Sequence, residues 1–211
     1  MIKTFKNLFI YMFFPTIFIS IFTNNYNSNL SIILQLISYI LLSIFFYIIY
    51  KDILKKDLKK FKLDNFKYIL IYWIIGFILM VLSNYIINYI IIPNGISNNE
   101  QGNINLILKN KLIYPISVCI FIPFIEEIVF RLELKKRCKN KYIFILLSSF
   151  IFALLHLITN TKLIEFLYFI PYFILGLTFS TIYTKTNNIF SNILAHIIHN
   201  TIIVIYYLIT L

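Results

Sequence analysis

The chain has 211 residues, of which 60% are hydrophobic and only 13% are charged, and its mean hydropathy is +0.85. Soluble domains carry about 25% charged residues, so this composition excludes an ordinary soluble protein and predicts an integral membrane protein. The net charge of +11 does not indicate nucleic acid as a partner, because the basic residues lie in the segments between apolar runs and form no motif of a nucleic-acid-binding kind.

Seven apolar runs follow one another along the chain with no long soluble segment between them. A helix needs about 20 apolar residues to cross a hydrocarbon core of about 30 Å. We therefore predict an all-α, polytopic transmembrane helix bundle of about seven spans (six to eight), forming a single membrane domain over residues 1–211. The expected spans are 8–22, 30–50, 68–92, 112–131, 142–158, 164–183 and 189–211.

The first run resembles a signal peptide, because Lys3 and Lys6 precede it. The residues after it, Thr23-Asn-Asn-Tyr-Asn27, contain no small-x-small cleavage site. We therefore expect the first run to be retained as a span.

The basic residues of the connecting segments predict the orientation. Segment 51–67 contains seven lysines and segment 131–141 contains six basic residues, whereas 23–29 contains none and 93–111 contains two. Cytoplasmic loops are enriched in Lys and Arg. The N-terminus and the two basic segments are therefore expected in the cytoplasm, and the C-terminus on the outside.

Ionisable side chains interrupt the apolar runs at a few positions. Of eight acidic residues only Glu126 and Glu127 do so, and all three histidines, His156, His196 and His199, also lie in apolar runs. A charged residue inside a membrane costs at least about 2.5–3.5 kcal/mol on insertion scales and usually has a function. The groups capable of acid–base chemistry therefore predict an intramembrane site.

Helical geometry divides these residues into pairs. Glu127 and Arg131 are at i and i+4 and can form an ion pair on one face. Glu126 lies about 100° around the helix from Glu127 and lacks that partner. His196 and Asn200 are also at i and i+4, so both can face one cavity.

The depths of the candidate residues also agree. The fourth and fifth runs form a hairpin that turns near Asn140, with Glu126 14 residues before this point and His156 16 residues after it. At about 1.5 Å per residue these residues lie about 21 and 24 Å from the turn. His196 matches them if the turn protrudes into the cytoplasm, which would end the fifth span early, near Thr159. We therefore expect one cavity, open toward the cytoplasmic half of the membrane, lined by Glu126, His156, His196 and Asn200.

Three motifs in this order resemble the intramembrane proteases of the CAAX-protease and bacteriocin-processing (CPBP) family, which includes the CAAX prenyl endopeptidases. They are Glu126-Glu127-x-x-x-Arg131, Phe152-x-x-x-His156 and His196-x-x-x-Asn200. The resemblance covers roughly a catalytic core at 112–205 and implies an intramembrane endopeptidase. It implies that Glu126 is the general base and that His156 helps to hold the water. It also implies that His196 and Asn200 stabilise the oxyanion, and that Glu127 and Arg131 form a supporting ion pair.

The metal requirement has two readings. Glu126, His156 and His196 could hold zinc around an open coordination position. The chain has no HExxH motif, however, and the nearby Asn200 is a poor zinc ligand. We therefore expect a glutamate-dependent mechanism without metal or cofactor, with zinc as the alternative.

The heavy use of Ile, Asn and Lys is typical of an AT-rich bacterial genome. We expect a multi-pass protein of a bacterial plasma membrane, in contact with lipid, whose substrate is a membrane-associated peptide or protein. Such an enzyme would serve peptide maturation or bacteriocin self-immunity. The alternatives are a non-catalytic immunity or partner-binding protein and a small ion or proton transporter, although transporters more often show internal repeats.

Overall fold

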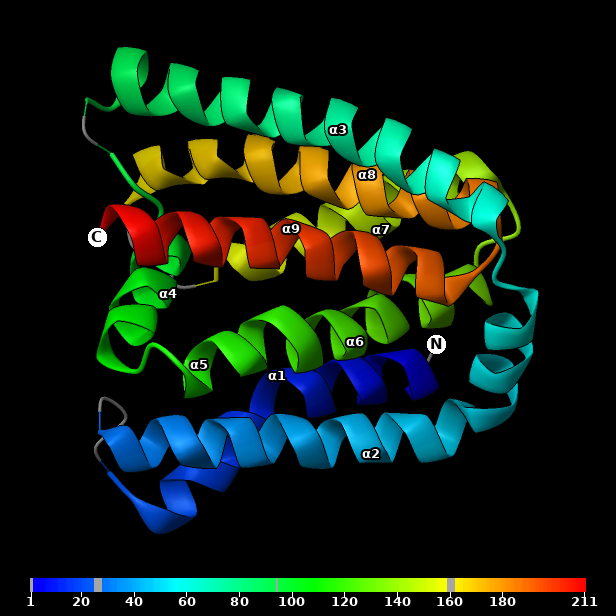
Figure 1. The fold of residues 1–211 in the computed structure, drawn as a ribbon, viewed down its shortest axis with the longest axis horizontal. Helices are drawn as coiled ribbons and strands as arrows, with labels where there is room; N and C mark the ends of the chain where they lie inside the picture. Colours follow the sequence, from blue (N-terminus) through cyan, green and yellow to red (C-terminus); the bar gives the residue numbers. More distant parts are fainter. Residues whose placement is uncertain (1, 25–27, 94, 159–161) are drawn as a thin grey trace.

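The computed structural model describes residues 2–24, 28–93, 95–158 and 162–211, and these form helices and connections without any strand. The helices run side by side along the longest axis of the molecule (Figure 1). The expected all-α polytopic bundle is confirmed. Within the described residues five helical segments are long and apolar enough to cross a membrane, and Lys6–Phe22 and Lys141–His156 are shorter apolar helices.

The helices occupy the following positions. The first half contains α1 (Ile2–Phe22), α2 (Asn29–Lys60), α3 (Leu63–Tyr85) with its π-helical continuation η1 (Ile86–Ile91), and α4 (Asn98–Lys109). The fourth span consists of α5 (Ile113–Ile116), the π-helical η2 (Ser117–Phe121), α6 (Ile122–Glu127) and the π-helical η3 (Ile128–Glu133). The chain then forms α7 (Lys141–His156), the 3₁₀-helical η4 (Leu163–Tyr168), α8 (Phe169–Thr186) and α9 (Ile189–Thr210).

Two elements differ from the expected pattern. Helix α2 continues through the lysine-rich segment to Lys60, because lysine is a good helix former once the chain has left the hydrocarbon. Helix α4 lies inside 93–111, which was expected to be only a polar connection. It begins at the N-cap Ser97, whose hydroxyl accepts the Glu100 N–H at 3.1 Å. The helix was not predicted from the sequence because the first turn of α4 is polar and resembles a loop.

Helix α7 is short for a membrane span. Its 16 residues extend about 24 Å at 1.5 Å per residue, less than the hydrocarbon thickness of about 30 Å. The helix ends at His156, and the expected end near Thr159 lies outside the described residues. Leu155, His156 and Ile158 line a cavity, and irregular backbone at membrane depth is tolerated where it lines a cavity. The early end of α7 therefore places His156 at the edge of an internal space.

The two ends of the bundle differ in composition. The lysine-rich end, defined by residues 51–67 and 131–141, also holds the N-terminus and the connection between α8 and α9, where Asp57 accepts the backbone N–H of Ile189 at 3.0 Å. The α4 end, defined by residues 95–112, also holds the C-terminus and the start of α2 (Figure 1). Tyr207, near the C-terminus, donates to Glu100 of α4.

Helix α8 packs closely against α7 through Gly176. A Cβ atom at this position would lie 2.7 Å from the Cα of Ser149, a backbone atom that cannot rotate away. The close approach aligns α7, which carries His156, with the centre of the bundle.

We expect Gly176→Ala to destabilise the protein by about 1–3 kcal/mol, as overpacked cores do, and to lower the midpoint of thermal unfolding in detergent. The matched control is Gly102→Ala on exposed α4, where nothing lies within 4 Å of the added Cβ. This control should be neutral or up to about 1 kcal/mol stabilising, because alanine favours a helix over glycine. Equal midpoints for the two variants would contradict the packing role of Gly176.

Candidate active site

Two adjacent carboxylates of α6 lie inside the bundle. Glu126 is 4% exposed and Glu127 is fully buried. The expected ion pair is present, with Arg131 Nε 3.3 Å from Glu127 Oε2 and both side chains inaccessible to solvent. Arg131 is therefore paired with Glu127, and Glu126 interacts with other residues.

Three aromatic rings surround the guanidinium of Arg131. Its Cζ lies 5.8, 4.9 and 5.6 Å from the ring centroids of Phe130, Phe152 and Phe179. Among the described residues none of its three nitrogens has a well-directed hydrogen bond. The cation is thus held by the Glu127 charge and by cation–π attraction, which strengthens in a desolvated site.

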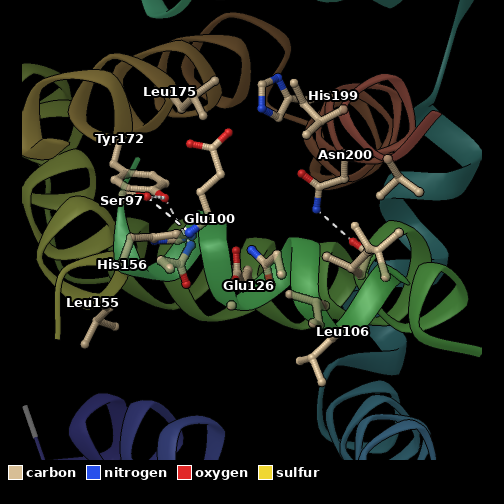
Figure 2. Close-up of a pocket in the computed structure, with 18 of the residues that line it drawn as sticks. Ser97, Glu100, Leu106, Glu126, Leu155, His156, Tyr172, Leu175, His199 and Asn200 are labelled. Carbon is tan, nitrogen blue, oxygen red and sulfur yellow. Dashed lines mark hydrogen bonds between the residues drawn. The ribbon is translucent and has the colours of Figure 1, made fainter. Parts of the chain in front are cut away.

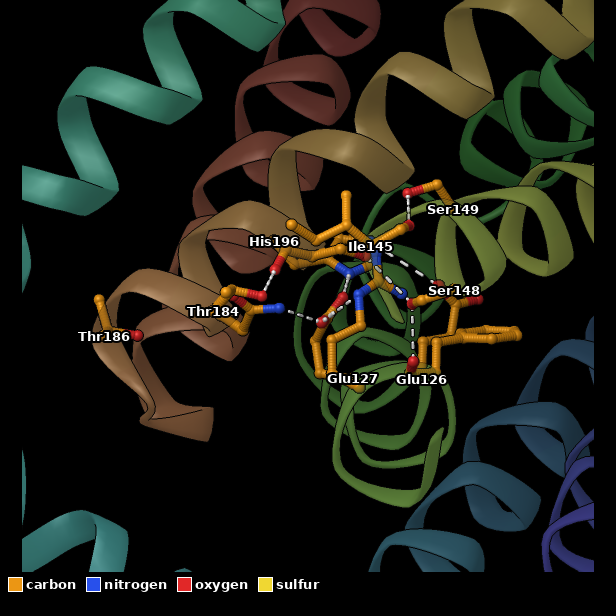
Figure 3. A network of polar contacts seen from close by, with 12 residues as sticks. Glu126, Glu127, Ile145, Ser148, Ser149, Thr184, Thr186 and His196 are labelled. Carbon is orange, nitrogen blue, oxygen red and sulfur yellow. Dashed lines mark hydrogen bonds and ion pairs between the residues drawn. The ribbon is translucent and has the colours of Figure 1, made fainter. Parts of the chain in front are cut away.

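Glu127 also organises the last helix. It accepts from Asn192 Nδ2 at 2.6 Å and from His196 Nδ1 at 2.8 Å (Figure 3). Sequence reasoning missed Asn192, although Asn192, His196 and Asn200 recur every four residues on one face of α9. That periodicity was the signal that could have found it. Glu127 therefore positions a candidate catalytic residue as well as pairing with Arg131.

The bond to Glu127 fixes the orientation of His196. A carboxylate only accepts hydrogen bonds, so the proton of this contact is on Nδ1. The other nitrogen, Nε2, points toward Glu126, 3.8 Å from Oε2. The ring stacks on Phe179 with centroids 4.5 Å apart. The imidazole therefore presents Nε2 alone to the reacting groups.

A residue from the first helix completes the surroundings of Glu126. The hydroxyl of Tyr11 donates to Glu126 Oε1, and the Tyr11 ring packs edge-on against Phe130 with centroids 6.0 Å apart. Sequence reasoning missed Tyr11, since a tyrosine in an apolar run carries no distinguishing pattern and lies 115 residues from its partner. The two oxygens of Glu126 thus face different groups, Tyr11 and His196.

His156 is oriented by its own helix. Its Nδ1 lies 2.8 Å from the carbonyl oxygen of Phe152, which can only accept, so Nδ1 carries a proton and Nε2 of the neutral ring is an acceptor. The ring stacks on Tyr172 with centroids 4.7 Å apart. The Tyr172 hydroxyl contacts Ser97 and Asn99 at the start of α4, at 3.0 and 3.1 Å.

Asn200 meets a defect in the fourth span. The N–H of Ile122 bonds to Ser117 five residues earlier, so the next bond in this π-helical register would run from residue 123 to Val118. Pro123 has no N–H to donate. The amide of Asn200 donates to the Val118 carbonyl instead, at 2.7 Å. One amide hydrogen of Asn200 therefore satisfies the Val118 carbonyl. The second hydrogen is available to a group bound in the cavity.

A cavity of about 1550 Å³ joins these groups, and Glu126, His156, His196 and Asn200 all line it. Figure 2 shows Glu126, His156 and Asn200 around this cavity. The expectation that these four residues share one cavity is confirmed. His199 also lines it and is 5% exposed, and its Nδ1 has no hydrogen-bond partner among the described residues.

The cavity does not open toward the lysine-rich end, which the sequence was expected to place in the cytoplasm. Its lining continues from the four residues toward the α4 end and includes no residue of 51–67 or 132–141. On the lysine-rich side the buried network of Glu127, Arg131 and Asn192 fills the interior. At the other end Glu100 lines the cavity and accepts from Tyr207. Burial raises the pKa of Glu100 above its ordinary value, and the Tyr207 hydrogen bond opposes this rise.

The zinc alternative depends on the arrangement of possible ligands. Among the residues the structure describes, no three His, Cys, Asp or Glu side chains are grouped to hold a metal ion. In His156 and His196 the Nδ1 atoms are engaged by the Phe152 carbonyl and by Glu127. Each imidazole could offer a metal only Nε2. The metal-free mechanism stays a prediction that requires a chelation experiment.

The comparison with protein families matches the part of the chain that holds the three motifs. Residues 108–202 match the family described as type II CAAX prenyl endopeptidase Rce1-like. The chain is also 27% identical over 146 residues to the UPF0177 protein YxdF of Lactococcus lactis subsp. lactis (strain IL1403), an alignment covering 65% of this chain and 77% of YxdF. No solved structure matches the chain. The resemblance inferred from the three motifs is therefore confirmed, and the segment 108–202 that carries them is similar to the Rce1-like CAAX prenyl endopeptidases.

Proposed function

We propose that the chain is an intramembrane endopeptidase that hydrolyses membrane-associated peptides or proteins with a water molecule activated by Glu126. One observation carries the proposal: Glu126 Oε2 faces His196 Nε2 across 3.8 Å, at the wall of a cavity large enough for a peptide segment. The proposed location is a bacterial plasma membrane with the N-terminus in the cytoplasm, in agreement with the lysine-rich segments.

Glu126 suits the role of general base because Arg131 is paired with Glu127. A water molecule beside Oε2 would give its proton to the carboxylate while its oxygen attacks the peptide carbonyl, and Glu126 would then return the proton to the leaving amine. Such proton transfer contributes about 10²–10⁴ in rate. His156 Nε2, an acceptor in the neutral ring, would orient the same water.

His196 and Asn200 would stabilise the oxyanion. With Nδ1 committed to Glu127, His196 donates through Nε2 only when both nitrogens are protonated. Donors in a dry site are worth more than in water, and the free amide hydrogen of Asn200 is the second donor.

Tyr11 gives a prediction for the positioning of the base. Tyr11→Phe removes the donor to Glu126 Oε1, and a hydrogen bond to a charged group is worth about 1.5–3 kcal/mol. We expect kcat to fall roughly 10- to 100-fold with KM unchanged, measured by peptide cleavage in proteoliposomes. Tyr39→Phe is the matched control, because Tyr39 also lines the cavity without a hydrogen bond to Glu126. A change in KM alone would refute the positioning role.

The function itself can be tested before any substrate is identified. Membrane and secreted peptides of cells that express the wild-type chain or Glu126→Gln would be compared by mass spectrometry of their new termini. Termini found only with the wild-type chain identify substrates, and synthetic peptides spanning them then serve in reconstituted cleavage assays. The absence of any such termini, with both proteins present at equal levels, would contradict the protease proposal.

Comparing the wild-type chain with Glu126→Gln also distinguishes the protease from the alternative function, a non-catalytic immunity or partner-binding protein. Glu126→Gln keeps the shape of the cavity and its hydrogen-bonding capacity with Tyr11. A protein that acts only by binding would therefore retain its protective or partner-binding effect in this variant. An enzyme would lose its effect on cells.

A further inference from the structure

The cavity is closed on one side of the candidate site and continues on the other. Toward the lysine-rich end the interior is filled by Glu127, Arg131, Asn192 and Phe179, all fully buried. These side chains separate Glu126 from the lysine-rich end, and the cavity lining does not extend past them. Access to the site must therefore be sought elsewhere.

Toward the α4 end the cavity reaches the surface. Its lining includes the exposed residues Gly102, Asn105 and Lys109 of α4. The lining includes further polar side chains, among them Asn88 and Asn103. Polar side chains of this kind give water hydrogen-bond partners inside the cavity. Both a hydrolytic water and a peptide backbone find hydrogen-bond partners along this route.

The charge distribution assigns the two ends to the two sides of the membrane. Segments 51–67 and 131–141 contain seven and six basic residues, and the α4 end contains Lys109 and Lys111, with Lys162 close by. Lys162 is placed there because Glu165, three residues on, accepts from Asn98 of α4 at 2.9 Å. Short cytoplasmic loops carry the excess of Lys and Arg, so the α4 end belongs to the outer side.

We propose that substrates enter the cavity at the α4 end, from the outer face of the membrane. This inference rests on the proposed protease function and narrows its substrate class to peptide segments exposed outside the cytoplasm, such as parts of exported or membrane-anchored peptides. It excludes a substrate whose scissile bond is presented from the cytoplasm.

Thiol labelling of the full-length chain in cells tests the route without any substrate. The native thiols allow a clean design, because Cys119 and Cys138 are both free and Cys138 lies in the lysine-rich segment 131–141. Cys119→Ser retains Cys138 as a reporter of that end. Adding Cys138→Ser and then Gln35→Cys places a single thiol inside the cavity, on the α2 wall. Ile48→Cys on the same helix, at a 62% exposed lipid-facing position, is the matched control.

A charged, membrane-impermeant maleimide is applied to intact cells and to inside-out vesicles. We expect Gln35→Cys to react in intact cells, Cys138 to react only in inside-out vesicles, and Ile48→Cys to react in neither. Reaction of Gln35→Cys only in inside-out vesicles, no reaction of Gln35→Cys from either side, or reaction of Cys138 in intact cells would each overturn the proposal. Because labelling requires no catalysis, a failure of the protease proposal is read separately, from the cleavage assay.

Discussion

Replacing Glu126 with glutamine is expected to lower the rate of peptide cleavage by about 10²–10⁴, the usual contribution of a general base. Glutamine keeps the shape of the side chain and removes the proton acceptor. The measurement is cleavage of an identified peptide in detergent or proteoliposomes. Glu100→Gln is the matched control, because Glu100 is a second carboxylate on the wall of the same cavity and the proposed mechanism assigns it no proton transfer. Retained cleavage by Glu126→Gln would end the proposal of a glutamate base.

The same cleavage assay also tests the two residues proposed to stabilise the oxyanion. His196→Ala and Asn200→Ala each remove an oxyanion donor and should cost about 10²–10³ in rate. Since these groups act on one transition state, the losses should not add in the double variant. Asn200→Ala also leaves the Val118 carbonyl without its donor, so the folded fraction of this variant must be measured alongside.

A chelator added to the wild-type enzyme separates the two chemical mechanisms. The glutamate mechanism predicts unchanged cleavage, because no step passes through a metal. Loss of cleavage on chelation, with recovery on addition of zinc, would assign Glu126, His156 and His196 to a metal site instead. Glu126→Gln would be inactive under both mechanisms, so the chelation arm is required to distinguish them.

Replacing Arg131 with alanine is expected to destabilise the protein by about 3–5 kcal/mol, the cost of leaving one member of a buried ion pair alone. The charge of Glu127 would remain at a fully buried position, and three aromatic rings would lose the cation between them. Thermal and denaturant unfolding in detergent measure the effect, and protein levels in the membrane should also fall. A fully stable Arg131→Ala protein would refute the supporting role of the pair.

Two further variants identify the cause of that loss. Lys139→Ala removes an exposed cation eight residues away and should stay within about 0.5 kcal/mol of the wild type, as surface substitutions do. Arg131→Lys retains the charge but loses the planar group that lies between Phe152 and Phe179. Its stability should therefore lie between that of Arg131→Ala and that of the surface control. Equal stability of Arg131→Lys and wild type would show that charge alone is required.

The sequence by itself determined the class of fold and the chemical groups of the site. Runs of about 20 apolar residues predict membrane-spanning helices, because a helix satisfies its backbone hydrogen bonds within one segment. The cost of burying ionisable groups singled out Glu126, Glu127 and the histidines, and i, i+4 spacing was sufficient to pair Glu127 with Arg131. The resemblance to the CPBP proteases rests on the same local spacings.

Only the tertiary structure decided which groups surround Glu126 and where the cavity leads. The contacts of Tyr11 with Glu126 and of Asn200 with Val118 join residues 115 and 82 positions apart, and no local period encodes such pairs. The direction of the cavity depends on which side of the site the side chains fill, a property of all the helices together. Depth arithmetic along single helices placed the candidate residues at one level. It carried no information about packing above and below that level, and for this reason it could not show that the cavity leads to the α4 end and not to the lysine-rich end.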